Sequence, residues 1–214
     1  MKNERKKRLI LLVPCVLIMA GCILIFTAVF RRLETNRKQG ELVVQYNQYI
    51  ATLKEVSDGE EVSAAMQPDS SAEPSGERDA AQPELIGILT IPKIDLTVAV
   101  GEGADDDTLK YMVGHIPETA TLGQRGNCAI SGHRSYSYGQ FFNRLDELTQ
   151  GDSIMVQRDQ NTYTYTVTHT FIVEPEETGV LNQTDDAQIT LVTCTPVRTA
   201  THRLIVKGIL TNVE

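Results

Sequence analysis

Two kinds of hydrophobic pattern divide the chain. Residues 9–30 form an apolar run of 22 residues without one charged side chain. As a helix rising 1.5 Å per residue, this run would span about 33 Å, which matches a hydrocarbon core of about 30 Å. Beyond residue 84 the apolar residues instead come in short runs bounded by turn residues, which is typical of β-strands. The pattern therefore predicts an N-terminal transmembrane helix followed by an all-β domain.

Basic residues flank the apolar run on both sides. Five of them lie in residues 1–8 and four in residues 31–38, a weak bias that favours an inside N-terminus with residues 31–214 outside. A cleaved secretory signal would have a shorter apolar core and a small-x-small cleavage site. Met-Ala-Gly-Cys, ending at Cys22, resembles the end of a lipoprotein signal, but the apolar run continues eight residues past it. We expect an uncleaved anchor at 9–30 behind a basic cytoplasmic tail at 1–8.

The segment between the anchor and the β-rich part has two characters. Residues 31–56 place apolar side chains at helical spacing, which predicts a helical stalk. Residues 57–83 are rich in Ser, Ala, Glu, Pro and Gly, contain no aromatic residue, and carry one basic and seven acidic groups. Such a stretch buries too little apolar surface to offset the entropy of ordering, so it predicts a flexible linker. The folded domain is then expected to cover residues 84–214.

Short β-rich runs follow one another through that domain. They lie at 85–100, where Pro92 separates two of them, and at 126–133, 153–158, 162–174, 188–194 and 202–210. Helical patches are short, at 105–113 and 139–148. Seven or eight strands with few helices and no βαβ rhythm predict a closed antiparallel or mixed β-barrel.

One of these runs, residues 162–173, alternates strictly between threonines and larger side chains. Side chains two residues apart share one face of a strand. The larger ones should therefore form a single packed face, which would include His169. The members of that face are Tyr163, Tyr165, Val167, His169, Phe171 and Val173.

Charge and cysteine usage exclude several classes of protein. The net charge is −8, and residues 84–214 carry 9 basic against 17 acidic groups, which argues against nucleic-acid binding. The four cysteines are too few and too scattered for a disulfide scaffold, and no Cys-x-x-Cys or histidine spacing indicates a metal site. We expect neither metal nor cofactor. Asp105–Asp107 should begin a helix, although a weak calcium site shared with the acidic residues at 174–177 is an alternative.

Three strand ends carry residues with chemistry. Cys194 ends an apolar strand and Arg203 begins the next, with eight residues between them, so an antiparallel hairpin would place the two opposite each other. A guanidinium beside a thiol favours the thiolate. His133 ends another strand, and the three together would supply a nucleophile, an acid–base group and a fixed cation. Alone, each has a structural explanation, and Cys128 is expected in the core.

Three stretches of sequence resemble sortases, the cysteine transpeptidases of Gram-positive cell surfaces. They are TLVTCTP (190–196), THRLIVKG (201–208) and GNCAISGHR (126–134), which resemble the nucleophile, arginine and histidine strands of that family. The resemblance covers residues 84–214, and residues 135–152 are most similar to class D, with class C next. Class C members carry an Asp-Pro-aromatic lid motif and a second membrane span. Neither occurs in this sequence, so we expect class D.

The resemblance implies a fold and a reaction. The fold would be an eight-stranded barrel. Cys194 would attack the Thr carbonyl of a sorting signal similar to LPxTG or LPxTA on a surface protein, while His133 protonates the leaving amine and later deprotonates the incoming one. Arg203 would stabilise the oxyanion, Thr193 would line the same pocket and bind substrate, and an amine of a peptidoglycan precursor would accept the acyl group.

Two other functions are open at this point. A class C-like enzyme would use the same chemistry with a pilin lysine as the acceptor. Alternatively, the barrel is a non-catalytic module that binds a wall component and in which Cys194 is inert.

Overall fold

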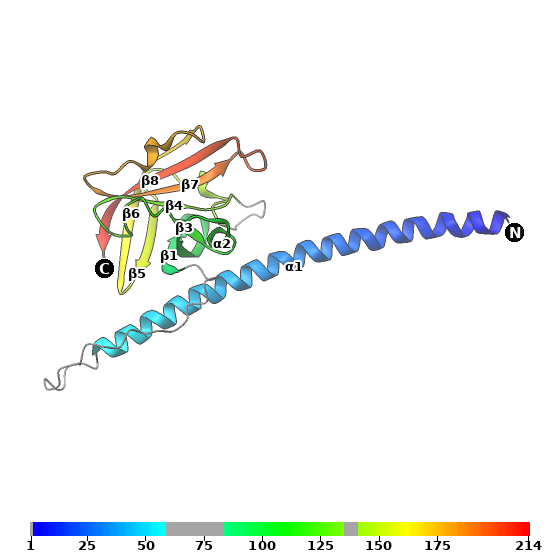
Figure 1. Cartoon of the computed structure of the whole chain (residues 1–214), viewed down its shortest axis with the longest axis horizontal. Coiled ribbons are helices and arrows are strands. Elements are labelled where there is room, and N and C mark those ends of the chain that lie inside the picture. Colours follow the sequence, from blue (N-terminus) through cyan, green and yellow to red (C-terminus); the bar gives the residue numbers. More distant parts are fainter. Residues whose placement is uncertain (1, 59–83, 135–140) are drawn as a thin grey trace. The chain divides into compact units, whose positions relative to one another are not determined.

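The computed structural model describes residues 2–58, 84–134 and 141–214 (Figure 1). It divides into two compact units, residues 1–40 and residues 41–214. The first unit consists of the N-terminal part of a single long helix, α1 (Lys2–Asp58). The second unit contains the end of that helix and all of the β-structure.

Helix α1 contains the segment with the composition of a membrane span. Among the described residues, the stretch Val16–Lys54 is long and apolar enough to cross a bilayer, with a mean hydropathy of 2.0 in its most apolar window. Large apolar side chains such as Leu17, Leu24 and Phe26 are exposed along it. Exposed apolar surface of this extent is unfavourable in water and favourable in lipid.

The C-terminal part of α1 is amphipathic and packs within the second unit. Tyr46 is buried against Ile88, Ala99 and Met112. Its hydroxyl oxygen accepts a hydrogen bond of 2.9 Å from the backbone N–H of Asp159. The helical spacing of apolar residues in this part of the chain thus corresponds to a packed face.

Eight strands close into a barrel in the order β1-β2-β3-β4-β7-β8-β6-β5, with β5 pairing back to β1. All neighbours are antiparallel except β2–β3 and β4–β7, which are parallel. The predicted closed barrel is therefore confirmed, and it is a mixed one. The strands are β1 (Leu85–Ile91), β2 (Leu96–Glu102), β3 (Val113–His115), β4 (Gly126–Ser131), β5 (Ser153–Arg158), β6 (Asn161–Val173), β7 (Ala187–Thr195) and β8 (His202–Val213).

The barrel interior is filled by apolar side chains from every strand. Because alternate residues of a strand point to opposite faces, each strand contributes every second side chain to this core. Representative fully buried members are Leu89, Val98, Val113, Ile130, Ile154, Tyr165, Leu191 and Val206. Cys128 belongs to the same cluster, as the sequence predicted.

The short helices differ in part from expectation. The described barrel domain contains one short α-helix, α2 (Asp106–Leu109), and 3₁₀ turns at Pro92–Ile94 (η1), Leu145–Glu147 (η2) and Thr178–Leu181 (η3). Helix α2 begins as predicted, because the Asp105 carboxylate accepts hydrogen bonds of 3.0 Å from two backbone N–H groups of its first turn. These bonds lower the pKa of Asp105. The helix is shorter than the predicted 105–113, since Val113 already belongs to β3.

The predicted packing of His169 is wrong. In the β6–β8 ladder Val167 pairs with Gly208 and His169 pairs with Lys207, so Thr168 is an extra residue that forms a β-bulge. A bulge interrupts the two-residue alternation. Tyr165 and Val167 before it are fully buried, whereas His169 and Phe171 after it are exposed. Ile172, on the other face, is exposed too, so this end of β6 has no packed face.

Candidate active site

The parallel pairing of β4 with β7 brings His133 next to Cys194. Each β7 residue lies 61 positions after its β4 partner, up to the pair Ser131 and Val192. The same register continues beyond that pair, because Thr193 Oγ1 donates a hydrogen bond of 2.7 Å to the carbonyl of Gly132, again 61 positions apart. One residue further along, this register places His133 beside Cys194.

The antiparallel pairing of β7 with β8 brings Arg203 to the other side of Cys194. The two residues are direct cross-strand partners, which confirms the expectation from the eight-residue spacing. Side chains of such partners share a face, with Cβ atoms about 4.5–5.5 Å apart. Because β7 lies between β4 and β8 in the barrel, Cys194 has the strand end of His133 on one side and its partner Arg203 on the other.

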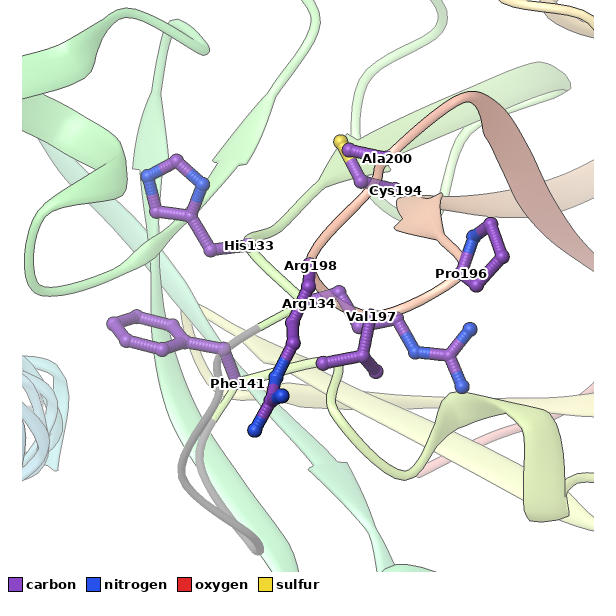
Figure 2. A pocket seen from close by; sticks show the side chains of 8 residues that line it. All are labelled: His133, Arg134, Phe141, Cys194, Pro196, Val197, Arg198 and Ala200. Atoms are coloured by element: carbon purple, nitrogen blue, oxygen red, sulfur yellow. The ribbon is translucent and has the colours of Figure 1, made fainter.

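A cavity of about 330 Å³ opens at the ends of β4 and β7 (Figure 2). Cys194 is partly exposed at this cavity, and the His133 side chain projects towards it from the end of β4. The ring of His133 meets the ring of Phe141 edge-on at 6.3 Å. The full lining consists of His133, Arg134, Phe141, Cys194, Pro196, Val197, Arg198 and Ala200.

Arg203 lines a different, smaller cavity of about 100 Å³. This groove lies between β7–β8 and the segment that contains η3, and Val173, Val192 and Ile205 contribute to its walls. Nη1 of Arg203 donates hydrogen bonds to the carbonyls of Ala200 (3.2 Å) and His202 (3.0 Å). The strand end that carries Cys194 therefore separates two hollows, one with the imidazole and one with the guanidinium.

Thr193 points to the opposite face of β7 from Cys194. It is buried, it does not line the cavity beside Cys194, and its hydroxyl is bonded to Gly132. Its observed contact fastens β7 to the end of β4, directly before His133. A role in substrate binding remains a prediction from the family resemblance.

The two barrel cysteines have different environments. Cys128 has 0% of its surface exposed, and burial raises the pKa of its thiol to about 12. At neutral pH such a thiol is almost entirely protonated and out of reach of a substrate. Cys194 is partly exposed at a cavity. Of the thiols in the described barrel, Cys194 is thus the one placed for nucleophilic chemistry.

Sequence reasoning passed over Arg134 and Phe141, which also line the cavity. Arg134 directly follows His133 in the sequence. This adjacency was the signal that could have placed it near the site. Phe141 has a left-handed backbone (φ 47°) and forms an isolated antiparallel bridge with Arg134. The next residue, Phe142, donates its N–H to the His133 carbonyl at 3.1 Å.

Adjacent strand ends at the rim of a closed mixed barrel carry a cysteine, a histidine and an arginine, and these residue types are the ones that acyl transfer through a covalent thioester uses. The fold and site thus define a class of protein, the thiol-dependent acyl-transfer enzymes built on a β-barrel. The family model described as the sortase domain matches residues 89–211, and the chain belongs to the sortase family. Sortases are cysteine transpeptidases.

Individual relatives span several sortase classes. The chain is 28% identical to Sortase A of Bacillus anthracis over 98% of both chains, and 27% identical to Sortase D of Bacillus subtilis over 92% of this chain and 96% of the relative. Among solved structures, the Sortase D5 transpeptidase of Clostridium perfringens is 34% identical with a TM-score of 0.55, covering 60% of this chain and 79% of that chain. Sortase C1 of Streptococcus agalactiae is 32% identical with a TM-score of 0.57, covering 60% and 68%.

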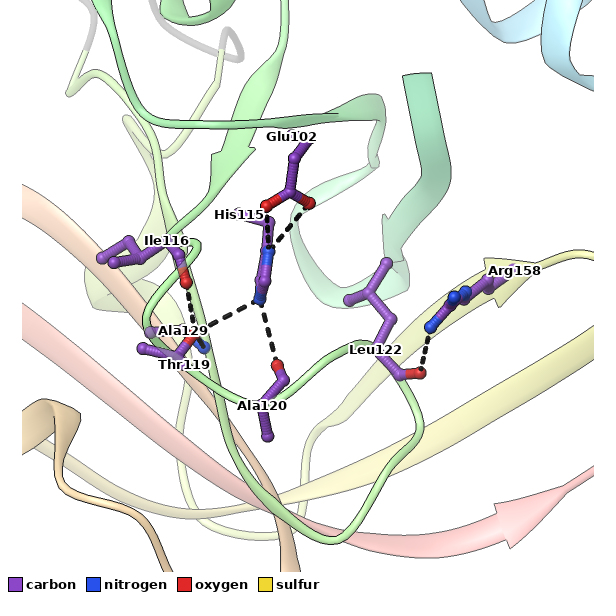
Figure 3. A network of polar contacts seen from close by, with 8 residues as sticks. All are labelled: Glu102, His115, Ile116, Thr119, Ala120, Leu122, Ala129 and Arg158. Atoms are coloured by element: carbon purple, nitrogen blue, oxygen red, sulfur yellow. Dashed lines mark hydrogen bonds and ion pairs between the residues drawn. The ribbon is translucent and has the colours of Figure 1, made fainter. Parts of the chain in front are cut away.

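A second polar cluster lies in the barrel wall around His115 (Figure 3). His115 is 3% exposed, and its Nδ1 lies 3.0 and 3.1 Å from the two carboxylate oxygens of Glu102. Its Nε2 lies 3.0 Å from the carbonyl of Ala120 and 3.2 Å from Thr119 Oγ1. The Thr119 hydroxyl donates to Ile116 and accepts from the N–H of Ala129. The imidazole thus joins β2 and β3 to the loop that leads into β4.

Replacing His115 by alanine should destabilise the barrel. The substitution leaves the Glu102 carboxylate and the partly buried Ala120 carbonyl without the buried imidazole that contacts both, so we expect the free energy of unfolding to fall by about 2–4 kcal/mol. Near-ultraviolet circular dichroism of the tyrosines during heating would measure this. His169→Ala is the matched control, because His169 is exposed and should change stability by less than about 0.5 kcal/mol. Equal melting temperatures for the two variants would contradict the role assigned to this cluster.

Proposed function

We propose that this protein is a membrane-anchored sortase that cleaves an LPxT-type sorting signal after its threonine and transfers the acyl group to an amine of a cell-wall precursor. The observation that supports this most directly is the row of adjacent strand ends, in which Cys194 lies between His133 and its cross-strand partner Arg203. The proposal assigns the reacting groups to these three residues.

In the first step, the Cys194 thiolate attacks the carbonyl carbon of the signal's threonine. A C–S bond forms, the peptide C–N bond breaks, and His133 donates a proton to the leaving amine. Arg203 stabilises the negative charge that develops on the carbonyl oxygen. Its Nη1 is bonded to the carbonyls of Ala200 and His202. A guanidinium carries five N–H donors, so those of Nη2 and Nε can serve the substrate oxygen while Nη1 stays bonded to the chain.

In the second step, an amine attacks the thioester carbonyl. The new C–N bond forms, the C–S bond breaks, and His133 accepts the proton that the amine loses. The thiolate is regenerated, and no oxidant, metal or cofactor is consumed. Cavities on both sides of Cys194 support separate approaches for the sorting signal and the amine.

The proposal places the protein in the cell membrane as a single-pass chain. Residues 1–8 form the cytoplasmic tail, 9–30 the anchor and 31–56 the stalk, so that the catalytic domain, 84–214, acts on the extracellular face. The apolar part of α1 supports the anchor by its length and composition. The predicted linker, 57–83, lies largely outside the described residues, which begin again at residue 84.

For the subclass, we favour class D, an enzyme that anchors proteins to the wall. No Asp-Pro dipeptide occurs in the 214 residues, so the lid motif expected of class C is missing from this sequence. The identities to Sortase D of Bacillus subtilis and to the Sortase D5 transpeptidase are consistent with class D. The similarity to Sortase C1 of Streptococcus agalactiae supports a pilin-polymerising enzyme as the second candidate.

The test is a transpeptidation assay on the full chain in detergent micelles. Peptides with Leu-Pro-Gln-Thr-Gly and Leu-Pro-Gln-Thr-Ala are incubated with oligoglycine, with diaminopimelate, or with a peptide bearing a lysine ε-amine. We expect cleavage after threonine, an acid-stable thioester on Cys194 by mass spectrometry, and a ligated product with a precursor-type amine. Preference for the lysine peptide would favour the pilin alternative. Absence of both cleavage and thioester would defeat the proposal.

A further inference from the structure

Arg134 connects three segments around the cavity. Its side chain is 9% exposed, and Nη2 forms a 2.9 Å ion pair with Asp146 Oδ1 in η2. Nη1 donates a 2.6 Å hydrogen bond to Thr195 Oγ1 at the end of β7. A charge with so little exposure is costly unless it is paired and hydrogen-bonded. The two contacts therefore fix the guanidinium, and through it the end of β4, against β7.

The contact with Thr195 is the next rung of the β4–β7 register. Arg134 and Thr195 are 61 positions apart, as are Gly132 and Thr193. A hydrogen bond thus joins the two strands directly before the pair His133 and Cys194, and another joins them directly after it. Along the two strands, the positions of His133 and Cys194 thus lie between two cross-strand bonds made by side chains.

These side-chain bonds matter because the regular backbone pairing of β4 with β7 ends before it reaches His133 and Cys194. The last paired residues of β4 and β7 are Ser131 and Val192, so His133 and Cys194 lie beyond it. Acyl transfer is sensitive to such placement, since a shift of about 1 Å can cost about 100-fold in rate. A clamp after His133 would hold the two reacting groups in register where the backbone ladder no longer does.

We propose that Arg134 is a positioning residue for transpeptidation, which holds the His133 strand end in register with Cys194 through Thr195 and is itself oriented by Asp146. This inference rests on the proposed function. Arg134 acts through the geometry of the His133–Cys194 pair, because its charge is balanced by the carboxylate 2.9 Å away. Lysine would keep the charge but lose the planar fork that contacts both partners.

The sharpest test uses two substitutions of Thr195. Thr195→Val keeps the shape but removes the hydroxyl that accepts the Arg134 hydrogen bond, whereas Thr195→Ser keeps it. For the full chain in micelles with the Leu-Pro-Gln-Thr-Gly peptide and oligoglycine, we expect Thr195→Val to lower kcat about 10-fold, with KM changed by less than about 2-fold. Thr195→Ser should stay within about 2-fold of the wild type in both parameters.

Substitutions of Arg134 extend the test. Arg134→Met should lower kcat about 100-fold, and Arg134→Lys should recover only part of the loss. The double variant Arg134→Met with Thr195→Val should be no slower than Arg134→Met alone, because both remove one interaction. If the kcat losses of the two single variants multiplied in the double variant, the positioning role would be overturned. Full activity of Thr195→Val would overturn it as well.

Arg144 supplies the matched control for fold stability. Like Arg134 it is a largely buried arginine bound to a carboxylate of η2, with two 2.8 Å contacts to Glu147 and one of 2.9 Å to the carbonyl of Ile94. It does not line the cavity. Arg144→Met should lower the melting temperature at least as much as Arg134→Met and leave kcat within about 2-fold. A matching loss of kcat in Arg144→Met would show a purely structural effect and contradict the inference. A wild type that neither cleaves nor ligates would instead refute the proposed function.

Discussion

Replacement of Cys194 by alanine is expected to reduce sorting-peptide cleavage by the full chain to the uncatalysed level, a loss of about 10⁴-fold or more. The reason is that covalent catalysis has no substitute for the sulfur: the other barrel thiol, Cys128, is fully buried with a pKa of about 12. The initial rate of release of the peptide's C-terminal fragment measures the loss. The thioester adduct should disappear with it.

Cys128→Ala is the matched control for this result. It removes a thiol of the same size from the core, about 1–2 kcal/mol of stability is expected to be lost with the buried sulfur, and turnover below the melting temperature should stay within about 2-fold. Equal turnover by the wild type and Cys194→Ala would rule out Cys194 as the nucleophile. Loss of turnover in Cys128→Ala at an unchanged melting temperature would indicate that Cys128, and not Cys194, is the nucleophile.

The parts of the fold that local patterns determine could be predicted from the sequence. The closed barrel followed from short β-rich runs with few helices, and the pairing of Cys194 with Arg203 followed from the eight-residue spacing of one hairpin. The core position of Cys128 and the helix start at Asp105 were also predictable. For the hairpin and the helix start, the determining residues lie within about a dozen positions of one another.

The remaining features depend on contacts between distant segments. Strand β3 has three residues and is held by β2 and β4 rather than by its own propensity. The bulge at Thr168, beyond which both faces of β6 are exposed, is set by the pairing of β6 with β8. The parallel β4–β7 register joins residues 61 positions apart, and no local pattern fixes such a register. The placement of His133 was accordingly expected from the family resemblance, and the contact of Arg134 with Thr195 was not foreseen.

The second large effect concerns Arg203. We expect Arg203→Ala to lower kcat about 10²–10³-fold, the usual cost of removing a donor that stabilises a developing oxyanion. Arg203→Lys should recover only a small part, because the guanidinium, which starts from the residue paired with Cys194, would have to serve the oxyanion while it bonds to the carbonyls of Ala200 and His202. An ammonium group has neither the reach nor the fork to replace both sets of contacts. Single-turnover formation of the Cys194 thioester measures the effect on the first step.

Arg125→Ala is the control for the loss of an arginine at a barrel rim. Arg125 directly precedes β4, and its guanidinium pairs with the Asp185 carboxylate and donates to the Asp185 carbonyl just before β7. It therefore lies at the end of these strands opposite to Cys194, and its removal should leave thioester formation within about 2-fold. Because the two substitutions remove the same side chain from the two ends of the β7 ladder, a large difference between them assigns the effect to position. If both variants acylated at the wild-type rate, the transition-state charge would have to be stabilised by another group, and the cavity-lining Arg198 would be the next arginine to test.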